Sequence, residues 1–436
     1  MEFKTSGELL KQIRKTLSIT QRELGMEKIN HNTISRIESN TESVTYLLAL
    51  RLSENINYIS SKKGIQVNIS ALELLETEEE KCEKWCKNEL NNIKLSNDTD
   101  ENIARYDEII MLSEKYKLKN ITIKAHELYS NLLYTLSRYQ ESIFHYNKCI
   151  EFYKDNDNLL KEIEINNKIG MCFYTTDLEE SYKYHYKAYE LLENMDKIED
   201  SIRLKVEVVY FIALYHARKE DFGCAKEYLD SIINLHCEDN DLKVKISILQ
   251  GNILLRQNNY SKAIEILECL TSLDKALIAP YEYMIYNNMG ICFNYLGDYE
   301  NSIRCLNTAI QLQIDKNSPD LTNSLIHAGK LHIKLSQDDI AMRFIEAAIG
   351  NAIKHGQAKY IFECNELQYL IFRKKNRLED CFNNTEKCKQ TIIDYKLDKD
   401  FNYRYCVMKV DYFIITNDLK SATTLLDHII IRKEIH

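Results

Sequence analysis

Turn-forming residues are scarce in this sequence, which has 2 prolines and 11 glycines among 436 residues. An extended β protein or an α/β enzyme needs more glycines for its turns, so the scarcity favours helices joined by short connections. Long apolar runs are also missing. No segment reaches the ~18 consecutive apolar residues of a membrane-spanning helix, and the N-terminus lacks the apolar stretch of a signal peptide. We therefore expect an all-α, cytoplasmic protein with no membrane partner.

Motifs of catalysis are absent as well. The sequence has no phosphate-binding loop, no G-x-G-x-x-G, no G-x-S-x-G and no H-E-x-x-H. Its 13 cysteines include no C-x-x-C pair, and no His or Cys cluster completes a metal site beside Cys82 and Cys86. We expect reduced, mostly buried thiols, no enzyme activity, no catalytic residues, no cofactor and no metal.

Charge is distributed unevenly along the chain, whose formal net charge is −9. Residues 1–68 carry 10 Lys/Arg against 7 Asp/Glu, a net of +3, whereas the remainder carries 47 against 59, a net of −12. A mildly basic segment attached to an acidic body indicates that only the N-terminal end contacts nucleic-acid phosphates.

The first 68 residues have the start signals of several short helices. A third helix is predicted from His31 to Glu38, with Ile34 and Ile37 facing inward, and Asn40 can take the left-handed conformation that ends it. A fourth helix is predicted at about 44–53. The helix-start signals are two capping boxes, Thr5-Ser6-Gly7-Glu8 and Thr20-Gln21-Arg22-Glu23, and the N-cap Asn30.

The stretch ITQRELGMEKINHNTISRIESN resembles the Cro/repressor-type (XRE) helix-turn-helix family. The features that carry the resemblance are Gln21, Gly25, Ile34 and the run Ser35-Arg36-Ile37-Glu38. Two features depart from the family: the turn before the third helix is about one residue short, and Asn40 stands where glycine is usual. The resemblance implies a DNA-binding domain with the third helix in the major groove.

Five residues are candidates for contacting double-stranded DNA. The start of the third helix would read bases, since Asn can bond adenine bidentately and Thr can offer its methyl group to thymine. Gln21 matches the family's phosphate contact, and Arg36 could contact phosphate or a base. Alternatively, the first residues only cap the helix, and Arg36 pairs with Glu38 or Glu42. The candidates are Gln21, His31, Asn32, Thr33 and Arg36.

From about residue 121 the chain repeats. Residues 281–313 resemble the tetratricopeptide repeat, in which small residues lie where two antiparallel helices touch. The small residue of the second helix recurs at intervals of 38 to 44, longer than the ~34 residues of the standard repeat, which predicts eight helical hairpins. These small residues are Ser142, Ser181, Ala225, Ala263, Ser302, Ala341, Cys381 and Ala422.

The sequence thus divides into residues 1–68, a DNA-binding domain; 69–120, a helical connector or degenerate first repeat; and 121–436, the hairpins. In the connector, helices are predicted at 72–90, which contains Trp85, and at 103–116. Stacked hairpins would form a right-handed superhelix whose first helices line a groove for an extended peptide.

Polar residues recur at the predicted groove positions of the first helices. Asn amides can donate to and accept from any peptide backbone, which gives an asparagine ladder a chemical purpose. The alternative is compositional, because the whole chain is rich in Asn, Lys and Ile. The candidate peptide-binding residues are Asn131, Asn167, Tyr210, Asn252, Asn287 and Asn294.

A helix-turn-helix domain followed by long tetratricopeptide repeats resembles the RRNPP family of bacterial regulators, most closely the NprR-like group in length. The resemblance implies a homodimeric transcriptional regulator that binds a specific operator and is controlled by a short signalling peptide (quorum sensing). Two alternatives remain: a protein that sequesters a response regulator or phosphorelay protein, and a scaffold without a signal ligand.

Overall fold

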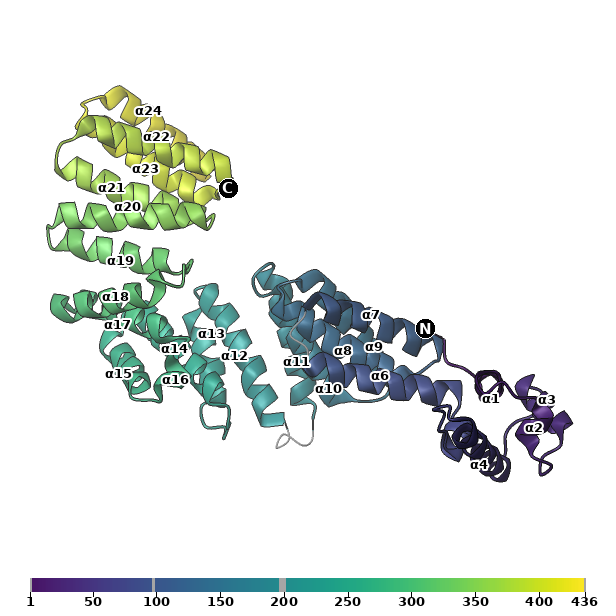
Figure 1. The fold of residues 1–436 in the computed structure, drawn as a ribbon. Coiled ribbons are helices and arrows are strands. Elements are labelled where there is room, and N and C mark those ends of the chain that lie inside the picture. The colour runs from purple at the N-terminus through teal and green to yellow at the C-terminus, as the bar shows by residue number, and fades with distance from the viewer. Residues whose placement is uncertain (1, 96–98, 196–200, 435–436) are drawn as a thin grey trace. The chain divides into compact units, whose positions relative to one another are not determined.

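The computed structural model describes residues 2–95, 99–195 and 201–434, and within these ranges it contains helices and no strands. The chain forms two compact units, residues 1–198 and 199–436. The predicted all-α fold is therefore confirmed, and Figure 1 follows the helices in chain order. None of the described helices is both long enough and apolar enough to cross a membrane.

The first unit begins with five helices that share one core. They are α1 (Ser6–Thr16), α2 (Gln21–Gly25), α3 (His31–Glu38), α4 (Tyr46–Lys63) and α5 (Ala71–Leu75). Both predicted capping boxes are present, the Asn30 side chain caps α3, and Asn40 has a φ of 57°. The sequence therefore determines where these three helices begin.

The fourth helix is longer than predicted, since it continues ten residues past Ser53 to Lys63. Two polar residues of this extension, Asn55 and Ser60, are buried and bonded: Asn55 donates to the Leu24 carbonyl at 3.0 Å, and the Ser60 hydroxyl donates to the Ile65 carbonyl. Gly64, with a φ of 64°, supplies the left-handed residue that terminates the helix.

The core of these five helices is one hydrophobic cluster that runs from Leu10 to Leu74, beyond residue 68. Helices α1 and α3 approach closely at Gly7, where a Cβ atom would lie 2.0 Å from the Ile37 carbonyl oxygen. Only glycine fits at that position. We call residues 5–75 the N-terminal bundle.

Two helices follow the bundle, α6 (Glu78–Leu95) and α7 (Thr99–Lys115). The single helix predicted at 72–90 is wrong, because the chain is interrupted between α5 and α6. Thr77 and Glu80 form reciprocal side-chain-to-backbone hydrogen bonds of 3.2 and 2.9 Å that start a new helix there. The sequence contains this capping signal, but the prediction of one helix followed the apolar periodicity instead.

Antiparallel helix pairs make up the rest of both units. The first unit contains α8 (Lys119–Thr135) with α9 (Tyr139–Asp155) and α10 (Leu159–Phe173) with α11 (Leu178–Glu193). The second contains the pairs α12 (Ile202–Arg218) with α13 (Phe222–Ile232), α14 (Asn240–Arg256) with α15 (Tyr260–Thr271), α17 (Glu282–Leu296) with α18 (Tyr299–Ile314), α19 (Leu321–Lys334) with α20 (Asp338–Lys354), α21 (Ala358–Lys374) with α22 (Leu378–Tyr395), and α23 (Lys399–Ile415) with α24 (Leu419–Glu434).

The eight recurring small residues are all buried on the second helices of these pairs, as predicted. The serines also bond across the pair: the Ser302 hydroxyl donates to the Gly290 carbonyl at 2.7 Å, and the Ser181 hydroxyl donates to the Gly170 carbonyl at 2.9 Å. A short helix, α16 (Lys275–Ile278), lies between α15 and α17 and was not predicted.

Candidate functional site

The start of α3 is an exposed tip of the N-terminal bundle. His31 and Asn32 are exposed and Thr33 is half-buried, while Ile34 and Ile37 are buried in the core. The Asn30 side chain accepts a hydrogen bond from the Asn32 backbone amide at 2.9 Å. Capping is thus performed by Asn30, which leaves the three predicted base-reading side chains outside the core.

Gln21 is engaged inside the bundle. Its side-chain amide donates to Glu38 at 2.9 Å, and Arg14 donates to both oxygens of the same carboxylate at 2.6 and 2.9 Å. Burial by itself would raise the pKa of Glu38, but the hydrogen bonds from Arg14 and Gln21 outweigh it and lower the pKa. These contacts link α1, α2 and α3, and they hold the Gln21 side chain rather than leaving it extended.

Arg36 is 61% exposed and pairs with Glu42 at 3.0 Å. A pair this exposed contributes little stability, so the guanidinium can leave Glu42 for a stronger anionic partner at small cost. Arg36 therefore lies on the outer side of α3 as a cation that can be recruited.

The chain segment before α1 connects the bundle to α6 and α7. The Phe3 ring packs against Trp85 and Tyr116, with centroids 6.3 and 5.6 Å apart. The Lys4 carbonyl accepts a hydrogen bond from Lys81 at 2.9 Å. We call residues 2–4 the N-terminal strap, because it is a second connection between the bundle and the helices that follow it.

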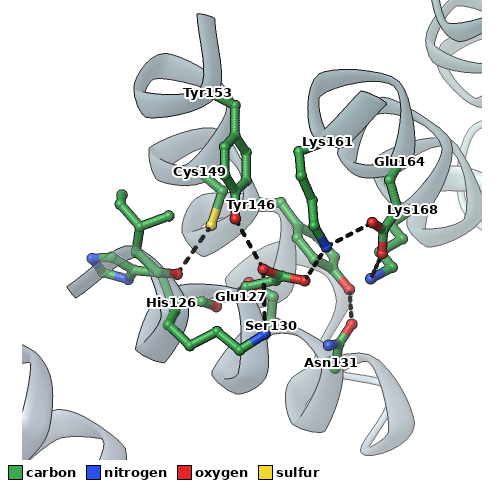
Figure 2. Close-up of polar contacts among 12 residues, drawn as sticks. His126, Glu127, Ser130, Asn131, Tyr146, Cys149, Tyr153, Lys161, Glu164 and Lys168 are labelled. Atoms are coloured by element: carbon green, nitrogen blue, oxygen red, sulfur yellow. Dashed lines mark hydrogen bonds and ion pairs between the residues drawn. The ribbon is translucent and has the colours of Figure 1, made fainter. Parts of the chain in front are cut away.

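Polar side chains of neighbouring first helices bond to one another in the first unit. Figure 2 shows Glu127 of α8 accepting from Lys161 of α10 and from Tyr153, each at 3.0 Å. Asn131 accepts a separate hydrogen bond from the Tyr146 hydroxyl at 2.7 Å (Figure 2). Asn131, a predicted peptide contact, is thus used within its own helix pair.

Two further predicted asparagines also have partners within the protein. Asn167 is buried and its Oδ1 lies 2.8 Å from Nδ1 of His185. Asn287 is buried on α17 and donates to Asn323 of α19 at 3.2 Å, and Asn323 in turn donates to Tyr360 of α21 at 3.4 Å. The amide ladder of the second unit therefore joins one repeat to the next.

The remaining predicted peptide contacts are half-buried on first helices. Asn294 accepts from Lys334 through its side chain at 3.5 Å and through its carbonyl at 3.0 Å. Tyr210 packs edge-on against Phe211 on α12, with centroids 5.3 Å apart, and Asn252 lies in the middle of α14. None of the six predicted residues lines the cavity on α19, α21 and α23 that is described next.

A groove of about 550 Å³ lies on the first helices of the last three pairs, α19, α21 and α23. Its apolar side chains include Leu370, Tyr403 and Val407, each about half exposed. We call it the C-terminal groove. This groove was not predicted from the sequence, although its residues recur at helical spacing on α21 and α23.

Paired charges border the C-terminal groove. Asp411 accepts two hydrogen bonds from Arg373, at 2.6 and 2.8 Å, and a third from Tyr369 at 2.7 Å. Glu366 pairs with Arg404, yet burial dominates and raises the pKa of Glu366. The C-terminal groove thus has an apolar centre formed by Leu370, Tyr403 and Val407, with paired cations and carboxylates along its border.

Comparison with known proteins supports the architecture. The tetratricopeptide repeat family matches residues 285–313. A search of the curated proteins found no match. The chain contains tetratricopeptide-type repeats, which defines the class of protein.

Many solved structures are similar in fold, including the following two. One is the apo form of the quorum sensor NprR from B. thuringiensis, with 16% identity, 81% of this chain and 98% of that chain covered, and a TM-score of 0.52. The other is a signal-transduction ATPase with numerous domains and a tetratricopeptide repeat sensor from Pyrococcus horikoshii. It has 11% identity, 97% and 72% coverage, and a TM-score of 0.53. Both similarities concern the fold.

Proposed function

We propose that this protein is a transcriptional regulator in which the N-terminal bundle binds operator DNA and the C-terminal groove binds a short signalling peptide. The observation that carries the proposal is the exposed start of α3, held outward by a core that uses the opposite face of the helix. Helices α2 and α3 form the helix-turn-helix of this proposal, and the N-terminal bundle, whose core extends the predicted domain 1–68 to Leu74, is its DNA-binding domain.

The DNA-binding part rests on the chemistry of α3. His31, Asn32 and Thr33 can reach base edges, and Arg36 can exchange Glu42 for phosphate. Gln21 is proposed to contact phosphate only by giving up its bond to Glu38. As a homodimer, the protein would occupy two half-sites about 34 Å apart.

The peptide-binding part rests on the C-terminal groove and on the fold shared with the quorum sensor NprR. An extended peptide would place apolar side chains on Leu370 and Val407, while its backbone and termini would meet the paired charges. Asn252, Asn287 and Asn294 stay candidate contacts for a longer ligand. The N-terminal strap and the α5–α6 connection link the bundle to the first repeats. We propose that they transmit the effect of peptide binding to the DNA-binding helices.

The DNA-binding test begins with duplexes selected by the full-length protein from a random pool. Fluorescence anisotropy would then compare variants on the selected duplex. We expect the Asn32→Ala, Arg36→Ala double variant to lose at least about tenfold in affinity, because one bidentate base contact accounts for that much. Glu42→Gln, which releases Arg36, should bind more tightly than the parent.

Arg51→Ala is the matched control, since it removes one exposed cation from α4 and leaves α3 intact. If the double variant binds as well as the parent, α3 is not the reading helix.

The peptide-binding test uses a displayed library of short random peptides, followed by calorimetry on the enriched sequences. Leu370→Asp and Val407→Asp should abolish uptake, because each puts an unpaired charge in the apolar centre of the groove. Ile353→Asp is the control, since Ile353 is an apolar residue of similar exposure but lies on a second helix, α20. Equal loss in all three variants, or no enrichment by the parent, would count against the groove.

A further inference from the structure

Three metal-binding side chains meet at the turn between α12 and α13. His216 lies near the end of α12, Asp221 caps α13, and Cys224 lies in its first turn. One ring nitrogen, one carboxylate oxygen and the sulfur lie within 4.8 Å of one another. Nδ1 of His216 lies 3.4 Å from Oδ2 of Asp221.

The turn that brings them together is one the fold repeats. Glu220 has a φ of 61°, and the Asp221 amide donates to the His216 carbonyl at 2.9 Å. In six other pairs, the residue before the helix cap has the same left-handed backbone conformation. These residues are Ser137, Asn258, Gly297, Ser336, Asn376 and Asn417. The backbone thus places positions i, i+5 and i+8 side by side before any ligand is present.

Side-chain chemistry at these three positions distinguishes the α12–α13 turn from those six turns. The corresponding trio is Phe293, Asp298 and Asn301 in the α17–α18 turn, and Leu254, Asn259 and Lys262 in the α14–α15 turn. The other four trios are Leu133, Arg138 and Glu141; His332, Gln337 and Ile340; Phe372, Arg377 and Asp380; and Phe413, Asp418 and Ser421. In this set, only the α12–α13 turn combines an imidazole, a carboxylate and a thiol.

The ligand set matches zinc. Imidazole and thiolate are ligands that Zn²⁺ prefers, whereas Ca²⁺ and Mg²⁺ require oxygen ligands. The His216 ring is held by stacking on Tyr228, with centroids 5.5 Å apart and planes 19° from parallel. The Asp221 side chain is 47% exposed, so a water molecule can reach a fourth ligand position.

We propose that the α12–α13 turn binds one Zn²⁺ ion through His216, Asp221 and Cys224, with water as the fourth ligand. Asp221 remains the helix cap, because its Oδ1 accepts from the Cys224 amide at 3.2 Å while Oδ2 faces His216. The thiol proton is lost to solvent when the sulfur binds the metal. The proposal is independent of DNA or peptide binding.

The test is titration of the metal-free, reduced full-length protein with Co²⁺, a spectroscopic substitute for Zn²⁺. We expect a thiolate-to-cobalt charge-transfer band that saturates at one Co²⁺ per chain and disappears when Zn²⁺ is added. Cys224→Ser should abolish the band. Asp221→Asn, which keeps the helix cap, should weaken Co²⁺ binding by at least about tenfold.

Cys269→Ser is the control, because Cys269 is an exposed thiol outside the cluster and its removal should leave the band unchanged. Circular dichroism would verify that each variant is folded. The proposal is overturned if the parent shows no charge-transfer band, or if the band survives Cys224→Ser.

Discussion

The N-terminal bundle and the repeat array are held together in different ways. In the bundle, one ion pair joins helices distant in sequence: Glu38 is only 4% exposed through its side chain, and Arg14 18%. In the array, charged pairs such as Arg373 with Asp411 link neighbouring repeats at 47% and 29% exposure. The stability of the bundle thus depends on a few contacts that no other contact replaces. The stability of the array depends on many similar contacts between neighbouring repeats. Loss of one contact should therefore destabilise the whole bundle, whereas in the array it should destabilise only the repeats next to it.

The largest effect is expected for Glu38→Ala. It leaves Arg14 partly buried without its carboxylate partner and with only the hydrogen bond to the Ile19 carbonyl, which costs about 3 kcal/mol of bundle stability. Hydrogen exchange of the full-length protein should show lost protection throughout α1 to α4. Asp339→Ala removes an exposed carboxylate that pairs with Lys375 in the array and should change no protection factor. If the two variants lost protection to the same extent, the bundle and the array would not differ in how they are stabilised.

A smaller effect is expected for Gly290→Ala. The added Cβ would lie 2.7 Å from Cγ of Leu306 and would force α17 and α18 apart, at a cost of about 1–3 kcal/mol. Protection should fall in that helix pair and its neighbours only, because repeats contact only adjacent repeats.

Gly350→Ala is the matched substitution, since nothing lies within 4 Å of its new Cβ on the exposed side of α20. It should stabilise the helix by up to about 1 kcal/mol. If both alanines act in the same direction, close helix contact at Gly290 is not what the array requires.

Acidification should affect the array before the bundle. Nδ1 of His126 on α8 lies 2.7 Å from Nδ1 of His145 on α9, and burial lowers the pKa of His126 from 6.5 to about 4. Because the folded pKa is below the unfolded one, this contribution to stability is complete above pH 6.5 and is lost as the pH falls toward 4. The loss should be on the order of 1–3 kcal/mol.

The measurement is urea unfolding across this pH range, with hydrogen exchange to locate the change in α8 and α9. Burial also lowers the pKa of His145, so His126→Phe should reduce the slope but not remove it. A slope identical to that of the parent would contradict the assignment to this pair.

The smallest effect is expected for Phe3→Ala, which detaches the N-terminal strap. An aromatic contact of this kind contributes about 0.5–1.5 kcal/mol. Trp85 is the only tryptophan of the chain, so its fluorescence should shift to the red as the ring becomes wetter. Leu72→Ala, an exposed position on α5, should leave the emission unchanged. An unshifted spectrum in Phe3→Ala would show that the strap does not cover Trp85.

Local signals predicted much of the fold. The capping residues Thr5, Thr20 and Asn30 start helices where expected, because a cap acts on amides only a few residues away. The helix pairs were predictable because each repeats one small contact residue. The C-terminal groove was not, since its apolar residues look like core residues until the three-dimensional packing leaves them exposed.

Local features of the sequence were enough to predict the helical class, the starts of α1, α2 and α3, the phase of the repeats and the outward-facing residues at the start of α3. The folded structure was needed to show which polar side chains already have partners: Gln21 donates to Glu38, Asn167 lies beside His185, and Asn287 donates to Asn323. It also decided that His216 and Cys224, eight residues apart, share one turn with Asp221. The physical reason is range: caps and periodicity act within a few residues, whereas the partner of a side chain depends on which helices the folded chain brings together.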